Sequence, residues 1–270
     1  MAMHHTPRTV CNFHFDYAVD PDQELNDIVR EYFLLDEAGI TSSFSRPESD
    51  EEVRAKHLLK NTTRRVSDGF ETGLLWRHDK VIFPDSYPMA FRRLQSLERR
   101  LNRDPSLYER VRHQIQDYLQ KGYARLLTRE DVQSADPERI WYIPLGVVTN
   151  PKKPNKLRLI WNAAAKANGT SLNSNLLKGP DMITSLPTVL SRFRQFPVAL
   201  TGDIKEMFHR IKIIRSDQNS QRFLWRNFPN KKPQTYVMQV ATFGATCSPC
   251  SAQYVKNVNA NEFIDRYRKL

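Results

Sequence analysis

The positions of apolar and polar residues along the chain predict four helices, because apolar side chains recur there every three or four residues. The first follows Asp20, a candidate N-cap, and ends at Gly39. The second and third lie on either side of Asp104, which with Pro105 provides an N-cap and a first-turn proline for the third. The fourth runs from Pro249 onward. The apolar faces of the first three are Leu25, Ile28, Val29, Tyr32 and Phe33; Ala90, Phe91, Leu94, Leu97 and Leu101; and Leu107, Val111, Ile115, Tyr118 and Leu119.

The second and third helices are expected to pack as an antiparallel pair, and the third is expected to stop at Gly122. Their outward faces are strongly basic. A solvated basic surface is the favoured interpretation of these faces, and a phosphate-binding surface is the alternative. The basic residues concerned are Arg92, Arg93, Arg99, Arg100, Arg103, Arg110 and Arg112.

Other stretches are rich in β-branched and aromatic residues and predict strands. Residues 69–83 are expected to form two short strands around a turn at His78–Lys80. Tyr142–Thr149 and Leu157–Trp161 are expected to pair as a hairpin with a lysine-rich tip. Because strands and helices mix without a regular βαβ rhythm, the expected fold class is α+β. Four more strands are predicted at Val198–Ile204, His209–Ile214, Gln221–Trp225 and Tyr236–Thr242.

The charge of the chain is large and unevenly distributed. Its 270 residues include 41 Lys and Arg against 30 Asp and Glu, a net charge of +11. Residues 1–50 hold 3 basic and 10 acidic residues, whereas residues 141–270 hold 20 and 6. A half that basic favours nucleic acid as a partner, with a merely solubilising surface as the alternative. No apolar run approaches the ~18 residues that span a bilayer, so no membrane partner is expected, and three cysteines favour a reducing compartment.

Acidic residues are scarce where the chain is most basic, because residues 151–232 contain 16 Lys and Arg but only four carboxylates. One of them, Asp203, follows the apolar run at residues 197–200. A carboxylate at the end of a buried strand in a cationic stretch suits a ligand of Mg²⁺, which prefers carboxylate and phosphate oxygens. A turn aspartate after Gly202 is the alternative. Cys247 and Cys250 form a CxxC motif without a second pair at zinc spacing, so a zinc site is not expected.

Three segments carry a resemblance to a known family. PVALTGDIKEMFHRIKI resembles motif A of reverse transcriptases, LRLIWNAAAKANGTSLNSNLLKGP their fingers segment, and FGATCSPCSAQY their motif B. Together with GLLWRHDKVIFPDSYPMAFRRLQSLERRL and WYIPLGVV, they resemble the Bel/Pao-type long-terminal-repeat retrotransposon polyprotein over residues 66–270. The resemblance implies an incomplete right-hand polymerase of fingers and partial palm. It divides the chain into an acidic helical spacer with a linker at residues 41–52 (1–65), a hairpin and two-helix region (66–140), and the fingers and partial palm (141–270).

The resemblance also implies roles for single residues. Asp203 would be the first catalytic carboxylate and would bind both Mg²⁺ ions of a two-metal nucleotidyl transfer. Phe208 would be the steric gate that excludes a ribose 2′-hydroxyl, with core packing as the alternative. Arg158 would contact the incoming nucleotide, and Lys152 or Lys153 its γ-phosphate. The nucleotide-binding residues are then Lys152, Lys153, Arg158, Ile204, Lys205, Glu206 and Phe208, and the template-primer residues are Gly244, Ser248 and Pro249.

One element of the family is missing. The aromatic-x-Asp-Asp motif, which supplies further metal-binding carboxylates, does not occur in the 270 residues. Glu206 is not expected to replace it, because on a strand it would face away from Asp203. The chain is therefore expected not to polymerise by itself and to be a truncated gene model or a decayed copy.

Three functions follow as alternatives. The first is a fragment of an RNA-directed DNA polymerase with template-primer and deoxynucleoside triphosphates as partners. The second is a non-catalytic nucleic-acid-binding protein derived from a retroelement, and the third is a decayed copy without function. The expected location is the cytoplasm, in a virus-like particle, or the nucleus, and the sequence leaves the oligomeric state open.

Overall fold

A computed structural model describes residues 47–267 of the chain, except 68, 134, 151 and 229. The chain divides into two compact units. The main unit comprises Pro47–Ile183 and Thr201–Leu270, and the small unit comprises Met1–Arg46 and Thr184–Leu200. The helix expected after Asp20 and the first half of the expected linker lie outside the described residues.

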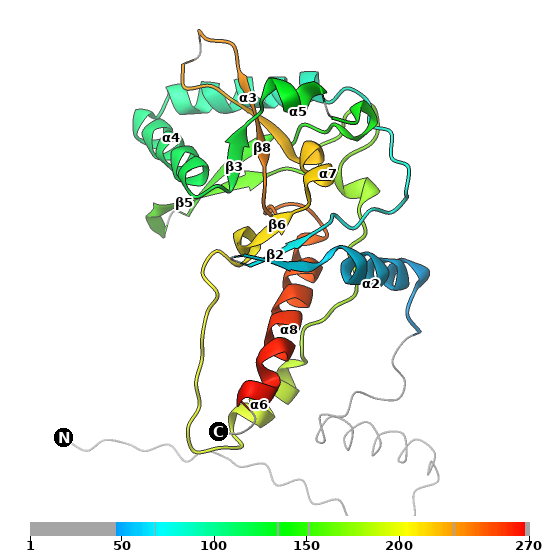
Figure 1. The fold of residues 1–270 in the computed structure, drawn as a ribbon. Coiled ribbons are helices and arrows are strands. Elements are labelled where there is room, and N and C mark those ends of the chain that lie inside the picture. The colour runs from blue at the N-terminus through cyan, green and yellow to red at the C-terminus, as the bar shows by residue number, and fades with distance from the viewer. Residues whose placement is uncertain (1–46, 68, 134, 151, 229, 268–270) are drawn as a thin grey trace, which may run out of the picture. The chain divides into compact units, whose positions relative to one another are not determined.

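The main unit is α+β, as predicted, and two of its sheets meet through one strand (Figure 1). In the first sheet, β1 (Arg64–Val66) is antiparallel to β2 (Gly69–Thr72), and β2 is parallel to β6 (Ile211–Ile213). In the second, β8 (Gln234–Met238) lies between β3 (Ala124–Leu126) and β7 (Arg222–Trp225). The backbone NH of Ile213 donates to the Gln239 carbonyl at 2.8 Å, so β6 also borders the segment that follows β8.

The predicted hairpin is confirmed as β4 (Leu145–Asn150) and β5 (Lys153–Trp161), which pair antiparallel from Leu145↔Trp161 to Thr149↔Leu157. Alternation decides which side chains face the core. Val147 and Leu159 lie opposite each other and are buried, whereas Arg158 projects outward and is exposed. The alternation of side chains along β5 thus places the positive charge of Arg158 outside the core.

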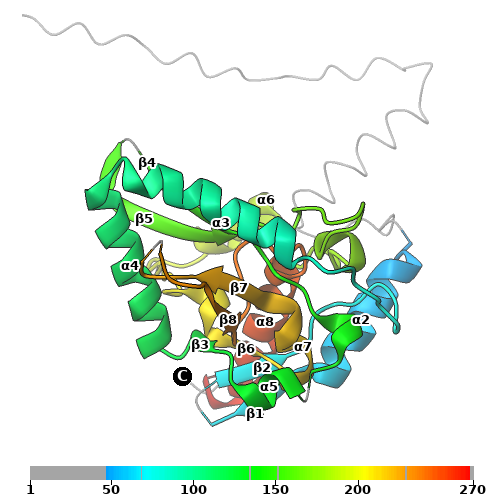
Figure 2. The ribbon, with the colours of Figure 1, turned by 90° about the horizontal axis from the view of Figure 1, so that it is seen from above.

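The two predicted amphipathic helices are confirmed as α3 (Tyr87–Asn102) and α4 (Pro105–Gln120). The Asp104 carboxylate accepts the backbone NH of Leu107 at 2.9 Å, as expected of an N-cap. The expected antiparallel packing is wrong, because the two helices meet at their connecting turn and then diverge (Figure 2). Both helices contact the same two sheets at different strands: α3 contacts β4 and β7, and α4 contacts β5 and β3.

Three other expectations about short elements are corrected. Residues 50–52, expected in a linker, begin α2 (Asp50–Thr62), because Ser49 and Glu52 form a reciprocal capping box. The second strand expected within residues 69–83 is absent, and Trp76 instead makes a single bridge with Leu176. The strand expected at His209–Ile214 is confirmed only as β6, since Met207–Arg210 form a 3₁₀ turn.

The strand expected at Val198–Ile204 is wrong. These residues have no regular secondary structure, and Val198 and Leu200 are 74% and 88% exposed. A short apolar run becomes a strand only by pairing with a free edge. Both edges of β6, the next strand along the chain, are occupied by β2 and by the segment after β8.

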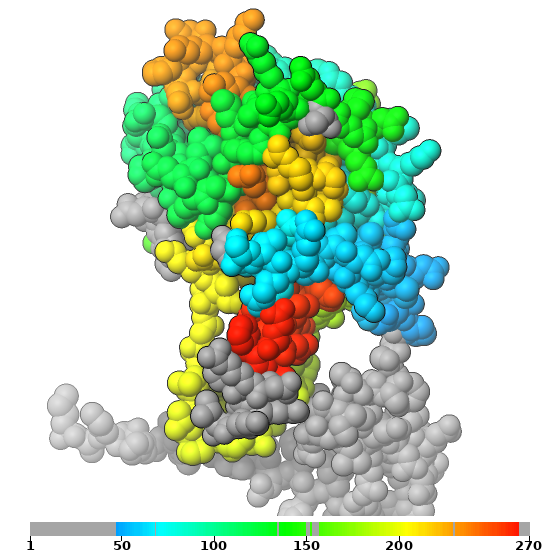
Figure 3. All heavy atoms as spheres, viewed as in Figure 1, coloured from blue at the N-terminus to red at the C-terminus, as the bar shows by residue number. Residues whose placement is uncertain are grey.

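The predicted C-terminal helix is confirmed as α8 (Ser248–Tyr267), whose first turns are buried. The small unit contributes α6 (Leu186–Phe193). Figure 3 shows that segments far apart in the sequence lie next to one another on this face of the main unit. None of the helices in the described part of the chain is long and apolar enough to cross a bilayer. The remaining short helices are α5 (Arg129–Gln133), α7 (Arg215–Gln218), and 3₁₀ turns at Pro137–Arg139, Asn173–Asn175, Met207–Arg210 and Asn219–Gln221.

Candidate functional site

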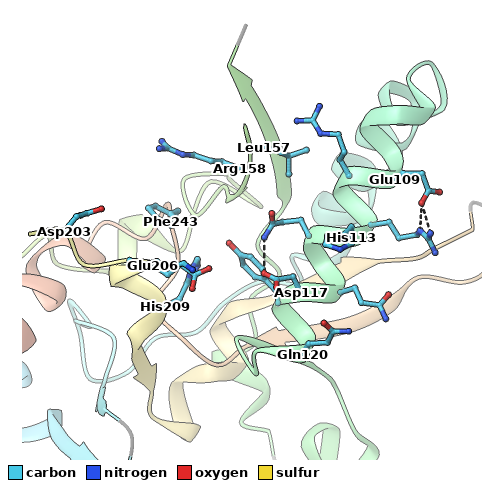
Figure 4. A pocket seen from close by; sticks show the side chains of 16 residues that line it. Glu109, His113, Asp117, Gln120, Leu157, Arg158, Asp203, Glu206, His209 and Phe243 are labelled. Atoms are coloured by element: carbon cyan, nitrogen blue, oxygen red, sulfur yellow. Dashed lines mark hydrogen bonds and ion pairs between the residues drawn. The ribbon is translucent and has the colours of Figure 1, made fainter. Parts of the chain in front are cut away.

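A pocket of about 1100 Å³ in the main unit gathers residues from four separate segments (Figure 4). One wall is α4, and the others come from β5, from residues 203–209, which lead into the 3₁₀ turn at Met207–Arg210, and from Phe243. We call it the α4–β5 pocket. Its lining residues are Glu109, Arg110, Arg112, His113, Gln114, Gln116, Asp117, Tyr118, Gln120, Leu157, Arg158, Asp203, Lys205, Glu206, His209 and Phe243.

Four of the predicted site residues meet in this pocket: Arg158, Asp203, Lys205 and Glu206. Arg158 reaches it because it points outward from β5. Its guanidinium makes no hydrogen bond or ion pair with any described residue and extends over the pocket in Figure 4. A partnerless cation at the rim of an open cavity is suited to an anionic ligand.

The environment of Asp203 differs from the expected one. Asp203 is exposed and lies on an irregular segment, not at the end of a buried strand. Its carboxylate has no hydrogen-bonding or ion-pair partner among the described residues, although it lines the same pocket as Arg158. The side chain is therefore accessible to a ligand, but the protein does not orient it.

The expectation that Glu206 lies on a strand is wrong. Its φ of 56° places it in the left-handed region rather than in a strand. Its carboxylate accepts hydrogen bonds from the Lys121 ammonium and the Tyr123 hydroxyl, both at 2.8 Å. Lys121 also pairs with Asp117 at 2.8 Å. The hydrogen bond from Lys121 is the main reason that the pKa of Glu206 lies below its usual range.

His209 forms part of the pocket wall. The ring is 5% exposed and lies between Tyr123, stacked at 4.9 Å, and the edges of Tyr118 and Phe243. Neither Nδ1 nor Nε2 has a hydrogen-bond partner within the described residues. Burial lowers the pKa of His209 to about 4, so the imidazole is neutral near pH 7.

Phe208, the expected steric gate, does not line the pocket. It is half-buried and packs edge-on against Phe243 at 4.7 Å between ring centroids. The side chain that reaches the pocket is therefore Phe243, with Phe208 behind it. This arrangement agrees with the core-packing alternative for Phe208.

Two of the three residues expected under a template-primer, Gly244 and Ser248, make close contacts beside this wall. Gly244 has a φ of 125°, and a Cβ on it would lie 1.9 Å from the Trp161 carbonyl oxygen. The buried Ser248 hydroxyl donates to the Thr242 carbonyl at 2.8 Å, while Pro249 is exposed. No sequence pattern singled out Asn173, whose side-chain amide donates to the Gly244 carbonyl at 2.9 Å.

Two of the remaining predicted residues, Lys152 and Ile204, are exposed outside the pocket wall. Lys152 is exposed in the turn between β4 and β5, and Ile204 is 49% exposed. Neither lines the pocket. The side chain of Lys153 lies outside the described part of the structure.

Binding of the expected Mg²⁺ ions would require carboxylates in the pocket that are not already paired with protein cations. Glu109, Asp117 and Glu206 are ion-paired with Arg112 or Lys121, so Asp203 is the only lining carboxylate without a protein partner among the described residues. Those residues contain no group of three His, Cys, Asp or Glu that could hold a metal. A pair of Mg²⁺ ions needs several carboxylates, so the described residues by themselves do not fit one.

Comparison with known proteins adds no relative. No protein-family model matches the chain, and no curated protein matches it. The resemblance to Bel/Pao reverse transcriptases therefore remains a prediction based on the motifs.

Proposed function

We propose that the chain is the fingers and first part of the palm of an RNA-directed DNA polymerase of the reverse-transcriptase type, and that its α4–β5 pocket binds a nucleoside triphosphate. One observation carries the proposal: Arg158 and the segment from Asp203 to Glu206, which the motifs assign to nucleotide binding, line one pocket. The volume of about 1100 Å³ is large enough for a nucleotide.

The charges of the pocket support an anionic ligand at the rim near Arg158. Glu109 pairs with Arg112, and Asp117 and Glu206 share the single positive charge of Lys121. The guanidinium of Arg158 stays uncompensated, and Lys205 adds a second positive charge. Phosphate oxygens accept hydrogen bonds from guanidinium in a bidentate geometry, so this rim suits a polyphosphate.

The test is a titration of the full chain with a deoxynucleoside triphosphate, followed by calorimetry. Arg158→Gln should weaken binding about tenfold or more, because a hydrogen bond to a charged group contributes roughly 1.5–3 kcal/mol. Arg129→Gln is the matched control, since Arg129 is exposed on α5 and does not line the pocket. Equal affinity for the wild type and Arg158→Gln would overturn the assignment.

A second function, non-catalytic binding of nucleic acid, is favoured by the outer face of α3. The side chains of Arg92, Arg93, Arg99 and Arg103 are exposed and make no hydrogen bond or ion pair within the described part of the chain. If this face binds a phosphate backbone, affinity for single-stranded RNA should fall steeply between about 50 and 200 mM salt.

The two functions are separated by the same variants. Replacing Arg92, Arg93 and Arg99 of α3 and Arg103, which follows its last residue, with glutamine should reduce RNA affinity and its salt dependence, because fewer counterions are released on binding. Nucleotide affinity should not change. Should the wild type bind RNA but no nucleoside triphosphate, the second function would stand and the first would fall.

A further inference from the structure

His209 is the one lining residue of the α4–β5 pocket whose polar side-chain atoms are both buried and without a partner in the described part of the chain. Three aromatic rings hold its imidazole, those of Tyr118, Tyr123 and Phe243, at centroid distances of 5.0, 4.9 and 5.4 Å. The ring orientation is thus fixed before any ligand arrives.

Packing alone does not account for an imidazole at this position. A buried donor or acceptor without a partner costs about 1–3 kcal/mol relative to its hydrated state. A phenyl ring would make similar contacts with the surrounding rings without that cost. The nitrogen atoms of His209 are therefore explained by a hydrogen-bonding partner that enters the pocket.

The charges around His209 define the kind of partner. The charged groups facing the ring are the Glu206 carboxylate and the Lys121 ammonium, which pair with each other at 2.8 Å. Tyr118 and Tyr123 add phenol groups. A neutral imidazole in this setting offers one donor and one acceptor and no net charge. It suits an uncharged group that can both donate and accept, because a phosphate would use only the donor and leave the acceptor unpaired.

We propose that His209 is a ligand-binding residue whose imidazole hydrogen-bonds the uncharged nucleoside part of a nucleotide in the α4–β5 pocket. The proposal rests on the proposed nucleotide-binding function and adds a residue to it. Sugar hydroxyls and base edges share the required chemistry, so the experiment distinguishes them.

The test compares two probes on the full chain, a deoxynucleoside triphosphate and inorganic tripolyphosphate. His209→Phe should weaken binding of the nucleotide about two- to tenfold, the value of one neutral hydrogen bond, and leave tripolyphosphate binding unchanged. Arg158→Gln should weaken both. His57→Phe, an exposed histidine on α2 outside the pocket, is the control for loss of an imidazole.

Two further arms identify the contacted group. A base contact makes the loss in His209→Phe differ among the four bases. A contact to the 3′-hydroxyl makes the loss equal for all bases and absent for a 2′,3′-dideoxynucleotide. In the wild type, the ¹⁵N resonances of the His209 ring should shift with the nucleotide and not with tripolyphosphate, a readout that a structural role would not produce and that remains available if His209→Phe does not fold.

The outcomes separate this inference from the proposed function. If the wild type binds the nucleotide while His209→Phe binds it equally well, or loses both probes in parallel, His209 has no such role and the proposed function stands. If the ¹⁵N resonances of the His209 ring do not shift when the nucleotide is added, the conclusion is likewise that His209 has no such role. If the wild type binds neither probe, nucleotide binding fails and this inference fails with it.

Discussion

At Gly244 any side chain would clash with the neighbouring backbone and strain its own. Its backbone has a φ of 125°, which L-residues rarely adopt, and it approaches the end of β5 closely. The space for a Cβ is occupied by the carbonyl of Trp161, a fully buried residue. The chain around Phe243, and with it one pocket wall, depends on the absence of a side chain here.

Gly244→Ala should therefore lower the free energy of unfolding by at least about 2 kcal/mol, since both the φ and the contact at 1.9 Å are unfavourable. Chemical denaturation measures the difference. Gly202→Ala is the control, because a Cβ there meets no atom within 4 Å. Similar stabilities of the two variants would contradict the structure around Gly244.

His209 should make the stability of the protein depend on pH. Burial lowers its pKa from 6.5 to about 4, so between these values the unfolded chain binds more protons than the folded chain. The stabilising contribution is fully present above pH 6.5 and is lost as the pH falls toward 4, with a total of roughly 3 kcal/mol.

Denaturation of the wild type and of His209→Phe across this range isolates the effect. Other groups, including Glu206, titrate in both proteins and cancel in the difference. The wild type should lose more stability than His209→Phe on acidification. Parallel losses would show that His209 is not buried in neutral form.

Helix α4 is specified by signals within its own segment. Asp104 caps its first turn, Pro105 follows at the first helical position, and Leu107, Val111 and Ile115 form a buried stripe. Gly122, with a φ of 70°, closes the turn after the helix. The same helix provides a wall of the α4–β5 pocket.

Asp104→Ala should cost about 1 kcal/mol of unfolding free energy, because the NH of Leu107 loses its acceptor. Thermal or denaturant unfolding gives the value. Ser106→Ala serves as the control, as Ser106 is exposed in the same turn without a capping bond. A cost no larger than that of Ser106→Ala would show that the cap contributes nothing.

In the molecule as a whole, one buried carboxylate joins segments far apart in the sequence. The side chain of Asp131 on α5 is 3% exposed and pairs with Arg125 on β3 and with Arg215 on α7. It also accepts the backbone NH of Thr128 at 2.9 Å. The hydrogen bond from Arg125 is the main reason that the pKa of Asp131 lies far below its usual range.

Asp131→Ala should destabilise the protein by roughly 3 kcal/mol, because it leaves Arg125 without its partner at a partly buried site. Glu109→Ala removes a solvent-exposed pair with Arg112 and should cost no more than about 1 kcal/mol. Denaturation of both variants tests the contrast. Equal costs would mean that the Asp131 contacts do not hold these segments together.

Elements with local signals could be predicted from the residues of their own segments. The helical period and cap at residues 104–122, the hairpin of β4 and β5, and the helix after Ser248 were all predictable from neighbouring residues. The mixed α+β class followed from these elements. Arg158 was assigned to the nucleotide by resemblance alone, and its outward position on β5 was not part of that prediction.

Features that depend on distant partners could be known only from the folded chain. The apolar run at Val198–Ile204 has strand character, but no free edge of β6 receives it, so Asp203 lies on an irregular exposed segment. The contact of Glu206 with Lys121 and the aromatic enclosure of His209 join residues widely separated in the chain. Periodicity and capping act over a few residues, whereas strand pairing and buried side-chain contacts are chosen by the competition among all surfaces of the folded chain.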